Sequence, residues 1–148
     1  GVSIGAKVPV QELRQVVLEL RAAKGMVIDP ADPDTRSVGS FFLNPIIDPA
    51  HAVPECPQFP EGDQIKLSAA WLIEQAGINR GWRPDANCAA AVSTKHTLAI
   101  VNLGGASAAD VLQVAAAIRN RVAEVHGVLL EPEPRLIGCA LPERSDHY

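Results

Sequence analysis

The chain has 148 residues, of which 47% are hydrophobic and 20% charged, a composition typical of one globular domain with room for part of a second. Its net charge of −4, without a run of like charges, argues against non-specific binding to nucleic acid or an anionic membrane, whereas a local cluster of donors would still bind a small anion. The three cysteines, Cys56, Cys88 and Cys139, are widely spaced and form no CxxC pair, which predicts reduced thiols without disulfides or a metal site. The sequence has no apolar stretch near the roughly 18 residues of a membrane span and no signal-peptide pattern, and we therefore expect a cytoplasmic protein.

The first predicted element is a helix from about Pro9 to Lys24. Its hydrophobic residues recur at helical spacing, Pro9 suits the first turn, and Gly25 suits the C-terminal end. The following segment, Asp29 to Asp34, contains two prolines that forbid a continued helix and aspartates that favour turns. We interpret it as a surface loop and as the best candidate for a domain boundary.

A strand is predicted from Gly39 to Leu43, with Ile46 and Ile47 continuing it past a proline. Four prolines between Pro49 and Gly62 indicate an ordered but irregular connection. A compact helix follows, because Ser68 can cap its start and Gly77 can terminate it.

The second half of the chain begins with two predicted strands, Ala89 to Ser93 and Leu98 to Asn102, joined by a four-residue turn. The longest helix starts at Ser107 with a capping box and ends at Gly127, and residues 128–130 and 136–137 are predicted as closing strands before a polar, frayed tail. Two main helices among short strands predict an α+β domain in two layers, with one small mixed or antiparallel sheet covered by the helices.

Composition and spacing alone identify no enzyme. The pair Gly104-Gly105 is the nearest approach to an anion-binding loop, but a glycine turn is the favoured interpretation. Strand alternation would place Ser40, Phe42 and Asn44 on one face, where the serine and the amide either line a polar site or hydrogen-bond locally.

Two carboxylates lie close together near the end of the chain. Glu131 and Glu133 could point the same way on extended backbone, which would raise the pKa of one of them, or they could be solvated loop charges, one of them paired with Arg135. His96, beside Lys95 in a turn, is expected to be exposed.

Taken together, these segments resemble the UDP-N-acetylenolpyruvoylglucosamine reductase family from about residue 21 to residue 138. The family pattern Gly-Ser-Phe-Phe-x-Asn-Pro matches Gly39 to Pro45, and its helix motif matches KLSAAWLIEQAG, Lys66 to Gly77. Its strand–loop–helix segment resembles LAIVNLGGASAAD, Leu98 to Asp110, and its terminal motif resembles LEPEPRLIG, Leu130 to Gly138. The first two motifs are specific.

The resemblance implies a flavoenzyme of cell-wall synthesis. Family members reduce UDP-N-acetylglucosamine-enolpyruvate to UDP-N-acetylmuramate, a peptidoglycan precursor, with hydride passed from NADPH through bound FAD. By this resemblance, Ser40 is the proton donor to the carbanion that hydride addition leaves, and Glu133 assists at the enol intermediate. Glu131 is then a non-catalytic neighbour.

The resemblance also implies substrate-binding residues. Asn44 matches a contact to the nucleotide sugar, Lys24 matches a lysine that contacts anionic groups, and His96 stands where relatives often carry a polar amide contact. The bland alternative for Lys24 is a positive charge favoured near a helix C-terminus. Two positions depart from the family pattern, since Leu43 replaces a lysine of some members and Pro134 replaces a β-branched residue.

In this family the flavin-binding domain precedes these motifs. We therefore expect residues 1–36 to be the C-terminal remnant of that domain and residues 37–148 to be the substrate-binding domain, so that the chain is a fragment or processed product. FAD and NADPH would be bound mainly by the missing domain, the complete protein would be monomeric, and the fragment alone would be inactive. The alternative is a non-catalytic nucleotide-sugar-binding module of the same fold.

Overall fold

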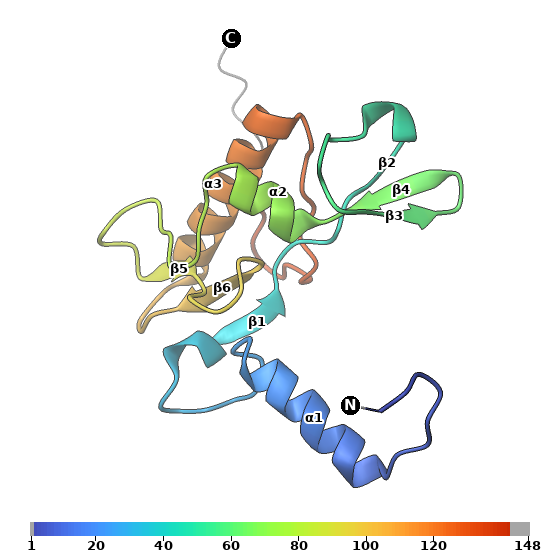
Figure 1. Ribbon diagram of the computed structural model, residues 1–148. Coiled ribbons are helices and arrows are strands. Elements are labelled where there is room, and N and C mark those ends of the chain that lie inside the picture. Colours follow the sequence, from blue (N-terminus) through green and yellow to red (C-terminus); the bar gives the residue numbers. More distant parts are fainter. Residues whose placement is uncertain (1, 143–148) are drawn as a thin grey trace.

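The computed structural model describes residues 2–142 and confirms the α+β class (Figure 1). The helices of this part of the chain are α1 (Val10–Ala22), α2 (Ala69–Gln75) and α3 (Ala108–His126). Its strands are β1 (Ser37–Ser40), β2 (Ile46–Ile47), β3 (Gln58–Glu61), β4 (Gln64–Leu67), β5 (Ala90–Val92) and β6 (Ala99–Asn102). The strands form two antiparallel sheets instead of the single sheet that the sequence predicted, with orders β1-β6-β5 and β2-β4-β3.

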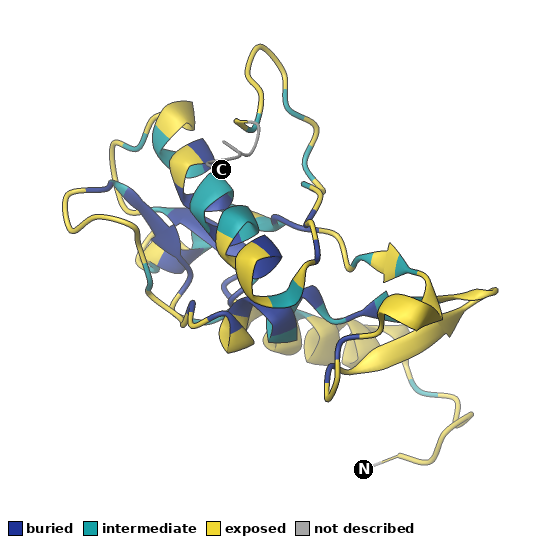
Figure 2. Cartoon of the chain, turned by 90° about the horizontal axis from the view of Figure 1, so that it is seen from above, coloured by how far each residue is buried: buried dark blue, intermediate teal, exposed yellow. Residues whose placement is uncertain are grey.

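The core lies where α3 covers β5 and β6 and packs against α2 (Figure 2). The buried face of α3 repeats at helical spacing, and its innermost residues are Val114, Ala115, Ile118 and Val122. Burying a valine or isoleucine side chain completely is worth about 1.5–3 kcal/mol, so this one face is a major contribution to folding.

The predicted capping signals of α3 are confirmed. Ser107 accepts a hydrogen bond from the backbone N–H of Asp110 at 3.3 Å, and the Asp110 carboxylate accepts one from the Ser107 N–H at 2.8 Å. At the other end Gly127 has the left-handed conformation, with φ of 68°, that a side chain would resist.

The predicted hairpin of β5 and β6 is also confirmed, with Ala91 opposite Val101. The side chain of Ser93 is buried, and its Oγ accepts hydrogen bonds from the backbone N–H groups of Lys95 and His96 at 3.0 and 3.2 Å. This serine therefore fixes the start of the turn that carries His96.

The strand predicted from residue 39 to residue 43 ends earlier, because Gly39 has a φ of +84° and the pairing with β6 shifts register between Ser37 and Ser40. Although Ser40, Phe42 and Asn44 line one cavity, as the alternation predicted, burial does not alternate beyond Ser40: Phe41 and Phe42 are both buried, each 2% exposed. Their rings meet edge to face, with centroids 5.2 Å apart.

The hairpin of β3 and β4 was missed, because the segment was expected to be irregular. All four residues of β3 are exposed, and Pro60 has no N–H to donate, so neither burial pattern nor composition indicates a strand. Phe59 nevertheless pairs with Lys66 across the hairpin, while Leu67 is fully buried at the junction with α2.

The predicted closing strands are absent from the described residues. In their place an isolated bridge joins Phe42 to Pro132, flanked by hydrogen bonds from Leu43 N–H to the Glu131 carbonyl at 3.0 Å and from Glu133 N–H to the Phe41 carbonyl at 2.8 Å. Prolines at alternate positions of this segment remove the donors that a longer ladder needs.

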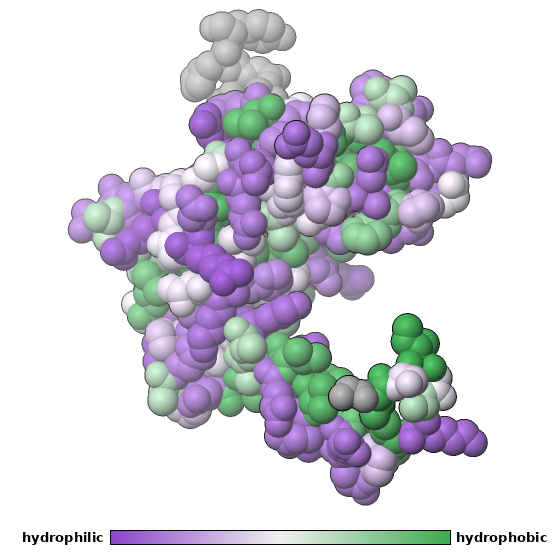
Figure 3. Space-filling model, in the orientation of Figure 1, coloured by the Kyte–Doolittle hydropathy of each residue, from purple (hydrophilic) through white to green (hydrophobic). Residues whose placement is uncertain are grey.

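Helix α1 projects from the body of the protein (Figure 1) and has no buried residue. Five of its hydrophobic side chains are 44–75% exposed, and Figure 3 shows hydrophobic surface gathered along the helix: Val10, Leu13, Val16, Val17 and Leu20. A connected set of exposed apolar residues of this kind is typical of an interaction surface.

Ser107→Ala should lower the free energy of unfolding of the chain by about 1 kcal/mol, because the capping serine no longer accepts from the first turn of α3. Urea unfolding followed by circular dichroism measures the change. Ser3→Ala, an exposed serine outside the helices, is the matched control and should have no measurable effect. Equal effects of the two substitutions would contradict the role of the cap.

Candidate functional site

Ser40 and Glu133 are brought together by the fold, although 92 positions separate them in the sequence. Both line a cavity of about 380 Å³ that also includes Asn44 and Lys66. Both also line a second cavity of about 410 Å³, on the side of Arg21 and α1. The serine at the end of β1 therefore lies between two adjoining cavities, with the same glutamate in each.

Backbone hydrogen bonds around Phe41 hold this arrangement. Phe41 donates to the Leu98 carbonyl at 2.7 Å, and its own carbonyl accepts from Glu133 N–H at 2.8 Å. Because Phe41 is also buried, the chain on both sides of it is fixed. Ser40 remains half-buried and Glu133 exposed, so both side chains can reach a ligand.

Glu131 lies in a different place. It lines a cavity of about 820 Å³ together with Asn44, His51 and His126, whereas Glu133 lines the two cavities beside Ser40. The hypothesis that the two carboxylates point into one site therefore finds no support, and only one of them accompanies the serine.

The sequence left two roles open for Asn44, a place in a polar site or a local hydrogen bond, and the structure shows the hydrogen bond. Its Oδ1 accepts from the backbone N–H of Ala69 at 2.9 Å, at the start of α2, where Ser68 also caps through its hydroxyl. Its amide lines the cavity of Ser40 as well. The residue thus joins the wall of this cavity to the helix motif, and its carbonyl oxygen is already engaged.

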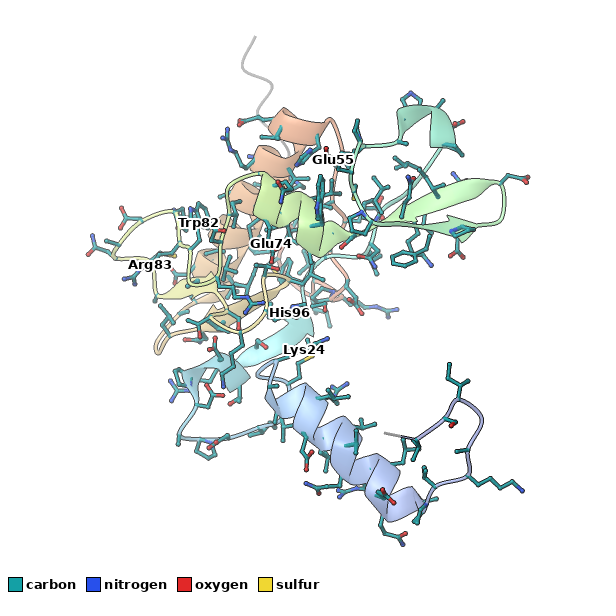
Figure 4. The ribbon with its side chains drawn as sticks, in the orientation of Figure 1. Lys24, Glu55, Glu74, Trp82, Arg83 and His96 are labelled. Carbon is teal, nitrogen blue, oxygen red and sulfur yellow. The ribbon has the colours of Figure 1, made fainter. Side chains whose placement is uncertain are left out.

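Lys24 and His96 are also brought near each other (Figure 4). His96 is half-buried instead of exposed, which corrects the sequence-based expectation. Burial lowers its pKa, and the neighbouring positive charges of Lys24 and Arg80 lower the pKa further, while Glu74 acts in the opposite sense. Glu74 is itself held by a hydrogen bond from the hydroxyl of Thr97 at 3.1 Å.

Sequence reasoning missed two basic residues at these places. Lys66 lines the cavity of Ser40 and forms an ion pair with Glu61 across the β3–β4 hairpin. Arg80 follows α2 and acts on His96. The signal was available, since Lys66 opens the specific helix motif and Arg80 lies three residues after its end.

Basic side chains gather in this region, although the net charge of the chain is −4. They come from three segments of the chain: Arg21, Lys24, Lys66 and Arg80. The carboxylates of Glu74 and Glu133 lie among them. Figure 3 shows the surface hollowed between the body and α1. Such an arrangement suits an anionic ligand. No three side chains of the described residues form a metal-binding group, and no helix among them is long and apolar enough to cross a membrane.

Comparison with known proteins decides the family. The family model of the C-terminal domain of UDP-N-acetylenolpyruvoylglucosamine reductase matches residues 29–137, a range that contains Ser40, Asn44, His96 and Glu133. The chain belongs to the UDP-N-acetylenolpyruvoylglucosamine reductase family. This confirms the resemblance drawn from the sequence motifs.

Three relatives that carry the name UDP-N-acetylenolpyruvoylglucosamine reductase illustrate the similarity. The protein of Mycobacterium marinum is 45% identical over 95% of this chain, that of Nocardia farcinica 48% over 93%, and the one named reductase 2 in Corynebacterium glutamicum 51% over 91%. The chain covers 40%, 39% and 39% of their respective lengths. The matched part of the reductases is therefore well under half of each relative.

The pKa of His96 should lie below its ordinary value of 6.5, because burial and two cations disfavour the protonated ring. Lys24→Ala should raise this pKa and Glu74→Gln should lower it further. Since the lowered pKa belongs to the folded state, the contribution of neutral His96 to folding stability is fully present above pH 6.5, its ordinary pKa. This contribution is lost as the pH falls through the lowered pKa of the folded state. NMR titration of the imidazole, assigned with His96→Asn, measures these shifts, and no response to Lys24→Ala would contradict the proximity.

Proposed function

We propose that the complete protein reduces UDP-N-acetylglucosamine-enolpyruvate to UDP-N-acetylmuramate with NADPH through FAD, and that this chain is its substrate-binding part. The observation that supports the proposal is the meeting of Ser40 and Glu133 at adjoining cavities within the range that matches the reductase family. The whole activity remains a proposal, because the chain spans about 40% of the length of its relatives.

Ser40 is the proposed general acid. FAD held by a preceding domain would supply the hydride that the substrate needs, and the carbon next to the substrate carboxylate would then carry negative charge. The serine hydroxyl gives its proton to that carbon, and the substrate enolate is basic enough to take it from a weak acid. Its place at the end of β1, next to the buried Phe41, supports this role because the backbone that carries the hydroxyl is held in position.

Glu133 is the proposed partner of Ser40 at the enol intermediate, which it stabilises or protonates. Its backbone is fixed by the hydrogen bond to Phe41, and Pro134 keeps it in extended geometry. Glu133 lines both cavities that Ser40 lines. We therefore expect Glu133 and Ser40 to contact the same part of the substrate.

The basic residues are the proposed binding contacts. The substrate carries a diphosphate and a carboxylate, so several negative charges need donors at separated points. Lys24 and Arg80 lie near His96, and Lys66 lines the cavity of Ser40 together with Asn44, which gives two separate groups of donors. We assign the diphosphate and sugar of the substrate to these groups.

The described residues do not themselves fit FAD. The pair Gly104-Gly105 resembles an anion loop only in composition, because Asn102 Oδ1 accepts the Gly104 N–H at 2.9 Å and the start of α3 is capped by Asp110. This agrees with the glycine-turn interpretation. FAD and NADPH are accordingly assigned to a preceding domain of the complete protein.

We propose that residues 1–36 are the remnant of that flavin-binding domain and that residues 37–148 form the substrate domain. The exposed hydrophobic side chains of α1 support this division, because they need a covering partner that the described chain does not supply. Reduced, buried Cys56 and Cys88 agree with a cytoplasmic location, and the complete protein is proposed to act as a monomer.

The complete reading frame that contains this chain tests the proposal. Its flavin is reduced anaerobically with NADPH, UDP-N-acetylglucosamine-enolpyruvate is added, and the flavin absorbance band is followed. Prompt reoxidation with formation of UDP-N-acetylmuramate is the expected result. A protein that binds the nucleotide sugar but never reoxidises its flavin would support the alternative, a non-catalytic binding module.

In the same assay Ser40→Ala should lower the rate of flavin reoxidation by about 10²–10⁴-fold, the usual contribution of a general acid, with substrate affinity nearly unchanged. Reduction of the flavin by NADPH should be unaffected. Ser37→Ala, three residues earlier on β1, is the matched control and should keep full activity. Equal losses of rate and affinity would exclude Ser40 as the proton donor.

Asn44 allows its two roles to be separated. Asn44→Asp keeps an acceptor for the Ala69 N–H and places negative charge at the start of α2, so it should retain stability yet weaken binding of the anionic substrate about tenfold. Asn44→Ala should lose about 1 kcal/mol of stability as well. Thermal unfolding and substrate titration of the complete protein measure both, and unchanged affinity of both variants would contradict a binding role.

A further inference from the structure

Asp34 is a buried acidic residue in the loop that the sequence predicted to be a surface segment. Its side chain is 6% exposed and lies in the short 3₁₀ helix Pro33–Thr35 before β1. Oδ1 accepts the backbone N–H of Thr94 at 2.9 Å, and Oδ2 accepts the hydroxyl of the same threonine at 2.5 Å. One carboxylate therefore ties the loop before β1 to the turn of β5 and β6, 60 residues later.

The end of α1 rests on the other side of this residue. Gly25 is buried with a φ of +69°, and a Cβ added to it would lie 3.1 Å from the Cβ and 3.1 Å from the carbonyl oxygen of Asp34. Only glycine fits this close approach without displacement. Because Lys24 is the preceding residue, its backbone position is set by the contact between Gly25 and Asp34.

A second interaction holds the same turn. Asp32 forms an ion pair with Lys95, and its other carboxylate oxygen accepts the Asp34 N–H at 3.1 Å. Consecutive residues of the turn, Thr94 and Lys95, are thus bound to alternate residues of the loop. The backbone N–H of the next residue, His96, donates a hydrogen bond to Ser93 Oγ, so the backbone of His96 is tied to the same turn.

We propose that Asp34 is a positioning residue, which fixes the spacing between Lys24 and His96 and so the affinity for the anionic substrate. This inference rests on the proposed function, since it takes those two residues as substrate contacts. Both carboxylate oxygens of Asp34 accept hydrogen bonds from Thr94, so this residue acts through its neighbours. Its loss frees the turn and the end of α1 from each other.

The experiment uses the complete protein and steady-state reduction of UDP-N-acetylglucosamine-enolpyruvate. Asp34→Ala should raise KM about tenfold, the cost of roughly one misplaced polar contact, and should leave kcat within about twofold. In a His96→Ala background the same substitution should change KM less than about twofold, because the contact that it positions is already gone. A role in stability alone would lower the active fraction, and so the apparent kcat, without changing KM, and an equal rise of KM in both backgrounds would show that Asp34 does not act through His96.

A milder pair of variants covers the case in which Asp34→Ala does not fold. Thr94→Val keeps the shape and the backbone donor but removes the hydroxyl, and should raise KM several-fold. Thr94→Ser keeps the hydroxyl and should behave as the wild type. Equal KM values for these two variants, or a loss of kcat without a change in KM, would overturn the positioning role.

The failure of this inference is distinguishable from failure of the proposed function. A wild-type protein that turns over normally, with Asp34→Ala and Thr94→Val unchanged in KM, removes only the positioning role. A wild-type protein that never reoxidises its reduced flavin removes the reductase proposal and this inference together.

Discussion

The crossing of residues 41–43 with residues 131–133 is the constraint on which the candidate site depends. Phe41 and Phe42 are both buried, and each flanking hydrogen bond joins the two segments within a few residues of Ser40 or Glu133. Removing a phenylalanine from such a core would cost about 3–5 kcal/mol, far more than any surface contact of the site. The polar side chains can therefore stay accessible while their backbone is held by packing.

Capping and periodicity explain why the helices could be predicted from the sequence. Ser107, Asp110 and Gly127 act within single turns of α3, so their effect is readable locally. The β3–β4 hairpin could not be read, because Pro60 and four exposed residues carry no burial pattern. The hairpin belongs to a sheet in which β4 pairs with both β2 and β3, and the pairing with β2 joins segments that are far apart in the sequence.

The site shows the same division between local and long-range information. Ser40, Asn44 and Glu133 were found by motif, but the burial of both Phe41 and Phe42 was not, because β1 ends at Ser40 after a shift of register near the positive φ of Gly39. The exposure of His96 was misjudged because its burial depends on segments far away in sequence, among them those that carry Lys24 and Glu74. No periodicity in the turn itself contains that information.

The position of α1 links the two halves of the proposed enzyme. Arg21 of this helix lines the same cavity as Ser40 and Glu133, and the hydrophobic residues of α1 are exposed beside it. A domain that covers this hydrophobic surface would therefore also approach Ser40, the proposed proton donor. Exclusion of water from Ser40 would then be coupled to burial of α1, so that domain packing and the environment of the reaction are set by one interface.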